Sequence, residues 1–202
     1  MIEQGIVAIR SPVILSRRPI LVALAGPNGA GKTTFYRTYL RPSGLRFVNA
    51  DVVALDLQID AYKAAKVADS LRRQLIEQRE SFIFETVFSD PAGDKLAFLK
   101  EVERSGYTVA LFFIGIKGPD VSNQRVAMRV LKGGHDVPGD KLQERYPRVM
   151  RNLKEALVEL SNVRVYDSSD LKRPYRLVAT VENGQEIQLH EPTPEWLRPL
   201  LP

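Results

Sequence analysis

The sequence contains no cysteine and only two histidines, His135 and His190. Disulfide bonds and thiolate metal sites are therefore excluded, and so few histidines do not favour a structural zinc site. A chain that needs no disulfides is typical of a reducing compartment, so a cytoplasmic location is expected. The chemistry of this protein has to come from hydroxyl, carboxylate and basic side chains.

Long hydrophobic runs are also missing. No stretch is apolar enough to span a membrane, and the first 18 residues are interrupted by Glu3, Gln4, Arg10 and Pro12. We therefore expect neither a membrane anchor nor a secretory signal peptide. Residues 1–18 are interpreted as a leader of unassigned role, with a possible edge strand at Ile6–Ile9.

Charge of one sign is not in large excess. The formal net charge is +5 over 202 residues, with 44% hydrophobic and 26% charged residues. This balance is ordinary for a globular protein and fits phosphorylated substrates as well as nucleic acid. The length predicts one domain spanning 1–202, divided into the leader (1–18), a core (19–170) and a C-terminal hairpin with its tail (171–202).

The most informative stretch is Pro19–Thr34, in which an apolar run leads directly into a glycine-rich loop. The loop satisfies the phosphate-binding spacing G-x-x-x-x-G-K-[ST], with a strand before it and a helix after it. Glycines let backbone N–H groups approach a phosphate, the lysine supplies a positive charge, and the Thr33 hydroxyl can bind Mg²⁺. The expected nucleotide-binding residues are Gly26, Asn28, Gly29, Ala30, Gly31, Lys32, Thr33 and Thr34.

The rest of the chain alternates between strand and helix patterns, which predicts a parallel sheet with right-handed crossovers. The expected class is α/β, a P-loop NTPase three-layer sandwich with a five-stranded mainly parallel sheet and a small C-terminal β-hairpin around Asn183-Gly184. Pro147 should kink or divide the helix at 138–160. Further strands are expected at 46–51, 81–86, 107–114 and 163–166, and helices at 34–40, 61–79, 91–104 and 119–131.

Two carboxylates follow the second and third predicted strands. Ligands of such sheets sit beyond the carboxyl ends of the strands, so Asp51 and Glu85 should meet the phosphate loop at one mouth. The most apolar strand, 107–114, is followed by Gly115-Ile116-Lys117, so a Walker-B carboxylate is missing at its most obvious place. This pattern favours a small-molecule kinase over a motor or switch NTPase.

Asp51 is the expected catalytic base, which would orient the acceptor hydroxyl and take its proton. The alternatives are a helix N-cap or a ligand of Mg²⁺-bound water. Glu85 with Thr86 is expected to bind substrate hydroxyls or the water shell of the metal. The alternative for Glu85 is a strand-end carboxylate paired with a nearby Arg or Lys.

Basic residues suited to phosphate follow the fourth predicted strand. Arg125 and Arg129 are four residues apart, on one helix face, and His135 comes shortly after them. Arg145, Arg148 and Arg151 form a second basic run, and we expect about two of the five arginines to contact phosphate. His135 is interpreted as a ligand contact or loop-fixing group rather than a metal ligand.

Taken together, these motifs resemble the zeta toxin family, in its compact branch described as predicted ABC-type ATPases. The resemblance implies a kinase that uses ATP and Mg²⁺ to phosphorylate a sugar hydroxyl of UDP-N-acetylglucosamine, and that a cognate antitoxin can block. The residues that carry it are Gly26–Thr34, Phe47–Asp51, Ser81–Thr86, Arg125–Val130, Gly133–Pro138 and Arg145–Arg148.

By position, the resemblance makes Lys32 the phosphate-binding residue, Asp51 the base and Arg125 a lid arginine, and it places Glu85 and Thr86 in the substrate pocket. His135 stands where larger members have a second lid arginine. Either Arg129 or Arg148 takes over that role, or turnover and substrate differ. Nothing in these residues supports a link to ABC transporters.

Two other functions remain open from the sequence. One is a kinase of another hydroxyl, on a different nucleotide sugar, a nucleoside or a nucleic-acid end, with nucleic acid the less expected partner. The other is a nucleotide-binding module with little catalysis, which the missing Walker-B carboxylate supports. An assay of phosphoryl transfer to an acceptor would distinguish these functions, because a pure binding module has no activity to lose.

Overall fold

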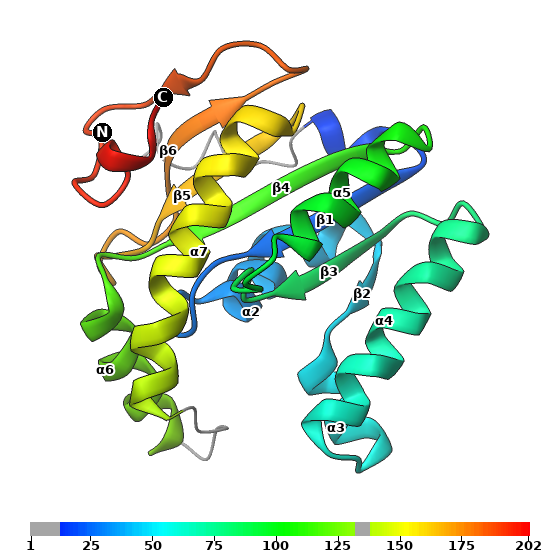
Figure 1. Ribbon diagram of the computed structural model, residues 1–202, viewed down its shortest axis with the longest axis horizontal. Coiled ribbons are helices and arrows are strands. Elements are labelled where there is room, and N and C mark those ends of the chain that lie inside the picture. Colours follow the sequence, from blue (N-terminus) through cyan, green and yellow to red (C-terminus); the bar gives the residue numbers. More distant parts are fainter. Residues whose placement is uncertain (1–12, 132–137) are drawn as a thin grey trace.

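The computed structural model describes residues 13–131 and 138–202, in which seven strands form one sheet in the order β2-β3-β1-β4-β5-β6-β7 (Figure 1). The first five of these strands are parallel, and the last two run antiparallel to their neighbours. The predicted α/β class is confirmed, and the C-terminal hairpin extends the sheet from five to seven strands. The strands are β1 Ile20–Ala25, β2 Arg46–Val48, β3 Phe82–Thr86, β4 Thr108–Gly115, β5 Val163–Asp167, β6 Arg176–Val181 and β7 Gln188–Leu189.

Helices cover both faces of this sheet. They are α2 Lys32–Phe35, continued by a π turn over Tyr36–Leu40, α3 Ala50–Leu57, α4 Ala61–Glu77, α5 Asp94–Arg104, α6 Pro119–Val130 and α7 Gly139–Glu159, and short 3₁₀ turns occupy Val13–Ser16, Arg41–Ser43 and Arg198–Leu200. The helices α4, α5 and α7 pack on one face, and the helix after the loop packs on the other. The strand expected at Ile6–Ile9 lies outside the described residues.

The strand β1 consists only of apolar residues because both of its faces are covered. Its alternate residues Leu21, Ala23 and Ala25 face the cluster under α4, α5 and α7, while Ile20, Val22 and Leu24 face the cluster under α2. All six are fully buried, as expected for a parallel strand covered on both sides. The strand that carries the phosphate loop is therefore held rigidly between two apolar layers.

The sequence predicts that Pro147 kinks or divides the helix; α7 is continuous through Pro147, so the division is wrong. An interior proline costs about 3 kcal/mol because it lacks an N–H and clashes with the preceding turn. Beyond it, however, α7 buries a long apolar face, and each large apolar side chain contributes about 1.5–3 kcal/mol. The buried residues of this face are Val149, Met150, Leu153, Ala156 and Leu157. Tertiary packing outweighs the local cost.

The helix α3 was not predicted, and the strand expected at 46–51 ends at Val48. Asn49 caps the helix: its side-chain oxygen accepts hydrogen bonds from the backbone N–H groups of Asp51 (2.7 Å) and Val52 (3.2 Å). None of the residues of α3 is buried. Because it has no buried face, its sequence lacks the hydrophobic periodicity that reveals other helices.

Within the described parts of the chain, no helix combines the length and the apolar character that crossing a lipid bilayer would require.

Candidate active site

The phosphate loop adopts backbone conformations that only glycine tolerates at two positions. Gly26 has φ of +141°, and a Cβ atom there would lie 2.2 Å from the carbonyl oxygen of Ile114. Gly31 caps α2 with φ of +94°, and a Cβ atom there would lie 2.6 Å from the hydroxyl of Tyr175. The loop therefore needs glycine for its path and for its close packing.

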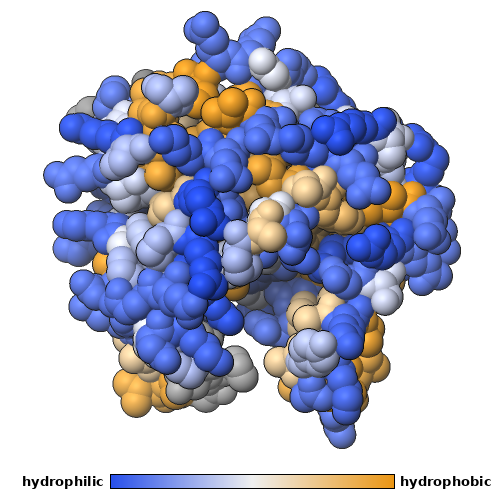
Figure 2. All heavy atoms as spheres, viewed as in Figure 1, coloured by the Kyte–Doolittle hydropathy of each residue, from blue (hydrophilic) through white to orange (hydrophobic). Residues whose placement is uncertain are grey.

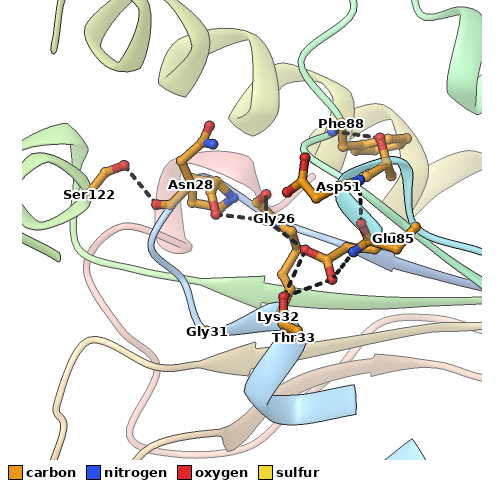
Figure 3. Close-up of polar contacts among 12 residues, drawn as sticks. Gly26, Asn28, Gly31, Lys32, Thr33, Asp51, Glu85, Phe88 and Ser122 are labelled. Carbon is orange, nitrogen blue, oxygen red and sulfur yellow. Dashed lines mark hydrogen bonds and ion pairs between the residues drawn. The ribbon is translucent and has the colours of Figure 1, made fainter. Parts of the chain in front are cut away.

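Two neighbouring segments clamp this loop. Ser122, on the first turn of α6, donates a hydrogen bond to the carbonyl oxygen of Asn28 at 2.7 Å (Figure 3). From the other side, the Tyr175 hydroxyl donates to the carbonyl oxygen of Gly31 at 3.0 Å and also interacts with Thr34. Burial raises the pKa of Tyr175, so its hydroxyl stays protonated and can donate. The loop is preformed by contacts that the motif alone does not reveal.

Lys32 lies at the centre of the site and is only 7% exposed. Its Nζ donates to the carbonyl oxygens of Gly26 (3.0 Å) and Pro27 (3.1 Å) and lies 3.9 Å from Oε1 of Glu85. Burial lowers the pKa of Lys32, and the positive charge of Arg129 adds to that effect, while the carboxylates of Glu85 and Asp51 oppose it. The ammonium group is thus under the influence of two carboxylates and one guanidinium.

Glu85 sits beside the phosphate loop because β3 is the direct neighbour of β1. Its Oε2 accepts hydrogen bonds from the hydroxyl of Thr33 at 3.1 Å and from Nδ2 of Asn49 at 2.9 Å. Glu85 therefore supplies a carboxylate beside the loop threonine, although no carboxylate directly follows β4. The strand order that brings β3 next to β1 is not encoded in a local sequence pattern.

The pair Thr33 and Glu85 fits a Mg²⁺ ion by its chemistry. Both supply hard oxygen ligands, and P-loop proteins hold Mg²⁺ with one loop hydroxyl, one carboxylate, phosphates and water. The described residues contain no group of three or more acidic or histidine side chains that could form an all-protein metal cage. A metal here would depend on the nucleotide for its remaining ligands.

Asp51 lies in the first turn of α3, two residues beyond the cap. Its side chain is exposed and points toward the phosphate loop (Figure 3). The N-cap role, which was the alternative for Asp51, belongs to Asn49. Sequence reasoning missed Asn49 because it did not predict the helix that Asn49 caps, and Asn49 also links this helix to Glu85.

A cleft of about 410 Å³ opens beside Lys32. It brings together Lys32, Asp51, Glu85 and Thr86, which the sequence predicted would meet. The Thr86 hydroxyl accepts a hydrogen bond from the backbone N–H of Phe88 at 3.1 Å. The other lining residues are Asn49, Ala50, Tyr62, Ala65, Lys66, Asp69, Arg72, Val87 and Lys95, and most of them were not predicted.

The predicted phosphate-binding arginines occupy different places. Arg125 donates from Nη2 to the carbonyl oxygen of Ser169 at 2.9 Å, and burial lowers its pKa. Arg129 is exposed on the same helix, and its charge acts on Lys32. Arg148 is paired with Glu144 one turn earlier on α7, and Arg151 donates to the carbonyl oxygen of Pro91 at 2.8 Å. His135 lies outside the described residues.

The C-terminal tail supports the segment that holds Arg125. Oδ1 of Asp167 accepts hydrogen bonds from Nε1 of Trp196 at 3.0 Å and from the hydroxyl of Ser169 at 2.6 Å. The Trp196 ring also lies directly on Gly115, where a Cβ atom would come within 2.2 Å of it. A chain of contacts therefore runs from Trp196 through Asp167 and Ser169 to Arg125.

We expect Trp196→Phe to raise the KM for ATP about 3- to 10-fold while changing kcat less than about twofold. The variant keeps an aromatic ring on Gly115 but removes the donor to the Asp167 carboxylate, and such charge-assisted hydrogen bonds contribute about 1.5–3 kcal/mol. Steady-state kinetics would measure the split, with Arg198→Gln in the same tail as the control. An unchanged KM for ATP would show that the tail does not position this segment.

The strand order, the clamped loop and the carboxylate beside it define a P-loop nucleotide-binding fold of the α/β class. A sequence model of the zeta toxin family matches residues 57–178, which is more than half of the chain. The chain therefore belongs to the zeta toxin family. The match covers Glu85, Arg125 and Arg129, whereas the phosphate loop and Asp51 precede it.

Other proteins are similar to this chain in sequence or in fold. An uncharacterised protein of Haemophilus influenzae is 26% identical over 126 residues, covering 60% of this chain and 88% of its own length. The AvrRxo1-ORF1:ORF2 complex with ATP contains a chain with a TM-score of 0.68 and 19% identity, over 87% of this chain and 61% of that one. A chain of the PezAT toxin-antitoxin system of Streptococcus pneumoniae has a TM-score of 0.58 and 18% identity, over 81% of this chain and 73% of that one. Our chain thus spans about three fifths of the AvrRxo1 chain.

Proposed function

We propose that this protein is an ATP- and Mg²⁺-dependent kinase that phosphorylates a hydroxyl group of a small molecule. The observation that supports the proposal is the cleft that Lys32 and Asp51 share, in which the Asp51 carboxylate is near enough to Lys32 to raise the pKa of that lysine. Phosphoryl transfer depends on positioning the acceptor hydroxyl and stabilising charge, and it needs little covalent chemistry from the protein. Membership of the zeta toxin family supports the same activity.

In this proposal the loop and Lys32 hold the phosphates, and a Mg²⁺ ion held by Thr33 and Glu85 would neutralise charge on them. Asp51 orients the acceptor hydroxyl and takes its proton as the oxygen bonds to the γ-phosphorus. The bond from that phosphorus to the β-phosphate oxygen breaks, and ADP leaves. Arg129 neutralises negative charge on the phosphoryl group during its transfer. Its guanidinium is close enough to Lys32 to lower the pKa of that lysine.

Arg125 is proposed to act on the opposite side of the loop from the acceptor. It does not line the cleft, and it is fixed by Ser169 in a segment that also supplies Tyr175 to the loop. A triphosphate whose γ end faces Asp51 would extend toward this segment. We therefore assign Arg125 to the nucleotide rather than to the acceptor.

The proposed acceptor is UDP-N-acetylglucosamine or a related nucleotide sugar. The support is the family to which the chain belongs and a cleft whose volume lies in the range of small-molecule sites, about 300–1,000 Å³. An antitoxin is the proposed protein partner, because the PezAT system contains one. The cytoplasmic location expected from the sequence stays a prediction.

Incubation with ATP, Mg²⁺ and a panel of acceptors would test this function. The panel contains UDP-N-acetylglucosamine, other nucleotide sugars, free N-acetylglucosamine, nucleosides and nucleic-acid ends. We expect ADP release that depends on the acceptor, together with a product heavier by one phosphate in mass spectrometry. A protein that binds ATP but modifies none of these compounds would be a nucleotide-binding module instead.

A further inference from the structure

A second hollow lies at the end of the sheet opposite the phosphate loop. Its volume of about 650 Å³ lies in the range of small-molecule sites, about 300–1,000 Å³. It is lined by Arg18 ahead of β1, by Arg46 in β2, and by Arg79, Glu80 and Ser81 ahead of β3, and these three strands are neighbours in the sheet. We call it the amino-edge hollow.

The strand β1 separates this hollow from the proposed active site. The hollow lies at the amino end of β1, and the phosphate loop follows its carboxyl end (Figure 1). The strand has six residues, and a rise of about 3.3 Å per residue puts the two sites about 20 Å apart. A ligand in the amino-edge hollow is therefore out of reach of Asp51 and Lys32.

Positive charge dominates the amino-edge hollow. Three arginines line it, and Glu80 is the one carboxylate among the described lining residues. In the parts of the chain that the structure describes, none of the three arginines forms an ion pair with a carboxylate, Glu80 included. Their charge is therefore not neutralised by the protein itself.

Two of the three guanidinium groups are already held in place. Nη1 of Arg18 donates to the carbonyl oxygens of Leu15 at 2.6 Å and Arg17 at 2.7 Å. Arg79 donates through Nη1 to the loop between α5 and β4, and its guanidinium lies over the ring of Tyr107, 5.7 Å from the ring centre. Each guanidinium has five N–H donors, so Nε and Nη2 of both arginines are left for a ligand. A group fixed in this way loses less entropy on binding.

Arg46 and Ser81 add further donors. Arg46 is exposed and has no hydrogen bond with any residue that the structure describes. The Ser81 hydroxyl accepts a hydrogen bond from the backbone N–H of Ile20 at 3.0 Å, which leaves its own hydrogen to donate. The hollow thus combines three guanidinium groups and one hydroxyl that can all donate to an anion.

A compact group with several negative charges fits these donors. Diphosphate oxygens accept the paired N–H groups of guanidinium in charge-assisted hydrogen bonds. No aromatic side chain is among the described lining residues, so the bases of single-stranded nucleic acid would have nothing to stack on. Exposed large apolar side chains gather instead at the two lower tips of the view in Figure 2, on α3 and at the end of α6.

We propose that the amino-edge hollow is a second anion site, which binds the diphosphate or polyphosphate group of a small molecule through Arg18, Arg46 and Arg79. Its distance from Asp51 makes such a molecule an effector rather than a substrate. The site does not depend on the proposed kinase function. If the arginines only keep this edge of the sheet solvated, the hollow has no saturable affinity for diphosphate.

Calorimetric titration with inorganic pyrophosphate tests this site without any turnover. The protein is first saturated with Mg²⁺ and AMP-PNP so that the phosphate loop is filled, and a protein-free titration is the blank. We expect saturable binding that Arg46→Gln weakens about tenfold, and that Arg46→Lys weakens less because it keeps the charge. Arg37→Gln is the matched control, because Arg37 is also exposed and lines neither the hollow nor the cleft.

Lys95→Gln distinguishes this hollow from the cleft beside Lys32, which Lys95 lines. We expect this variant to bind pyrophosphate as the unmodified protein does. The proposal is overturned if pyrophosphate does not bind, if Arg46→Gln binds it with unchanged affinity, or if Lys95→Gln loses the binding instead. Binding of a single-stranded oligonucleotide that depends on Arg46, without binding of pyrophosphate, would also overturn it. None of these results involves phosphoryl transfer, so the acceptor panel tests the kinase separately.

Discussion

Replacing Asp51 with asparagine is expected to lower kcat for phosphoryl transfer by about 10²–10⁴-fold, the usual contribution of a positioned general base. Asparagine matches aspartate in size but cannot take the proton of the acceptor hydroxyl. The helix should remain intact, because the Asp51 group that bonds to the Asn49 cap is its backbone N–H and not its side chain. ATP affinity should change by less than about threefold, since the Asp51 side chain is exposed.

Rapid-quench kinetics with ATP and an active acceptor would measure the chemical step, and calorimetry would measure ATP binding. Asp56→Asn is the matched control, because Asp56 is exposed on the same helix and does not line the cleft. Full activity in Asp51→Asn would show that another group takes the proton. A parallel loss of ATP binding would show that Asp51 supports the nucleotide rather than the acceptor.

Glu85→Gln is expected to raise the Mg²⁺ concentration for half-maximal activity about tenfold or more and to lower kcat by about 10²-fold. The amide keeps the shape of the side chain but loses the negative charge beside Thr33, where the metal is proposed to bind. A magnesium titration at saturating ATP would measure both effects. Glu80→Gln, just before the opposite end of the same strand, is the control and should leave the titration unchanged.

The Glu85 variant should also alter the pH profile. Burial lowers the pKa of Lys32, and the carboxylate of Glu85 is the main influence that raises it again. Removing that carboxylate therefore lowers the pKa of Lys32 further, so the lysine loses its proton at lower pH. The alkaline limb of kcat/KM for ATP, which reports the free enzyme, should shift to lower pH. An unshifted limb would mean that Glu85 does not act on Lys32.

The phosphate loop, the strand-helix alternation and the meeting of Asp51 with Glu85 could be predicted from sequence, because each depends on local pattern or on the general rule for parallel sheets. The neighbour of β1 could not be predicted, since strand order arises from crossovers that local sequence does not encode. The sequence therefore placed Glu85 after the third strand without showing that this strand lies directly beside β1. The helix α3 was missed because none of its residues is buried, so its apolar residues follow no helical period.

The basic residues that line the cleft, and the two arginines of α6, could not be placed from sequence. Arg72 and Lys95 come from different helices and meet only through Asp69 and the sheet beneath them. A pattern along one helix indicates an amphipathic face but does not identify the cleft that this face lines. Likewise, the spacing of Arg125 and Arg129 indicates a shared face, yet one side chain reaches Ser169 while the charge of the other acts on Lys32.

Trp196 is the only tryptophan in the chain, and its indole N–H is bonded to the carboxylate of Asp167. Indole emission depends on nearby charge and hydrogen bonding, so the fluorescence of the unmodified protein reports on this one place. Because Asp167 connects through Ser169 to Arg125, a nucleotide that displaces Arg125 would alter that emission. The molecule thus contains its own optical probe, with which ligand titrations can be followed without labels or added dyes.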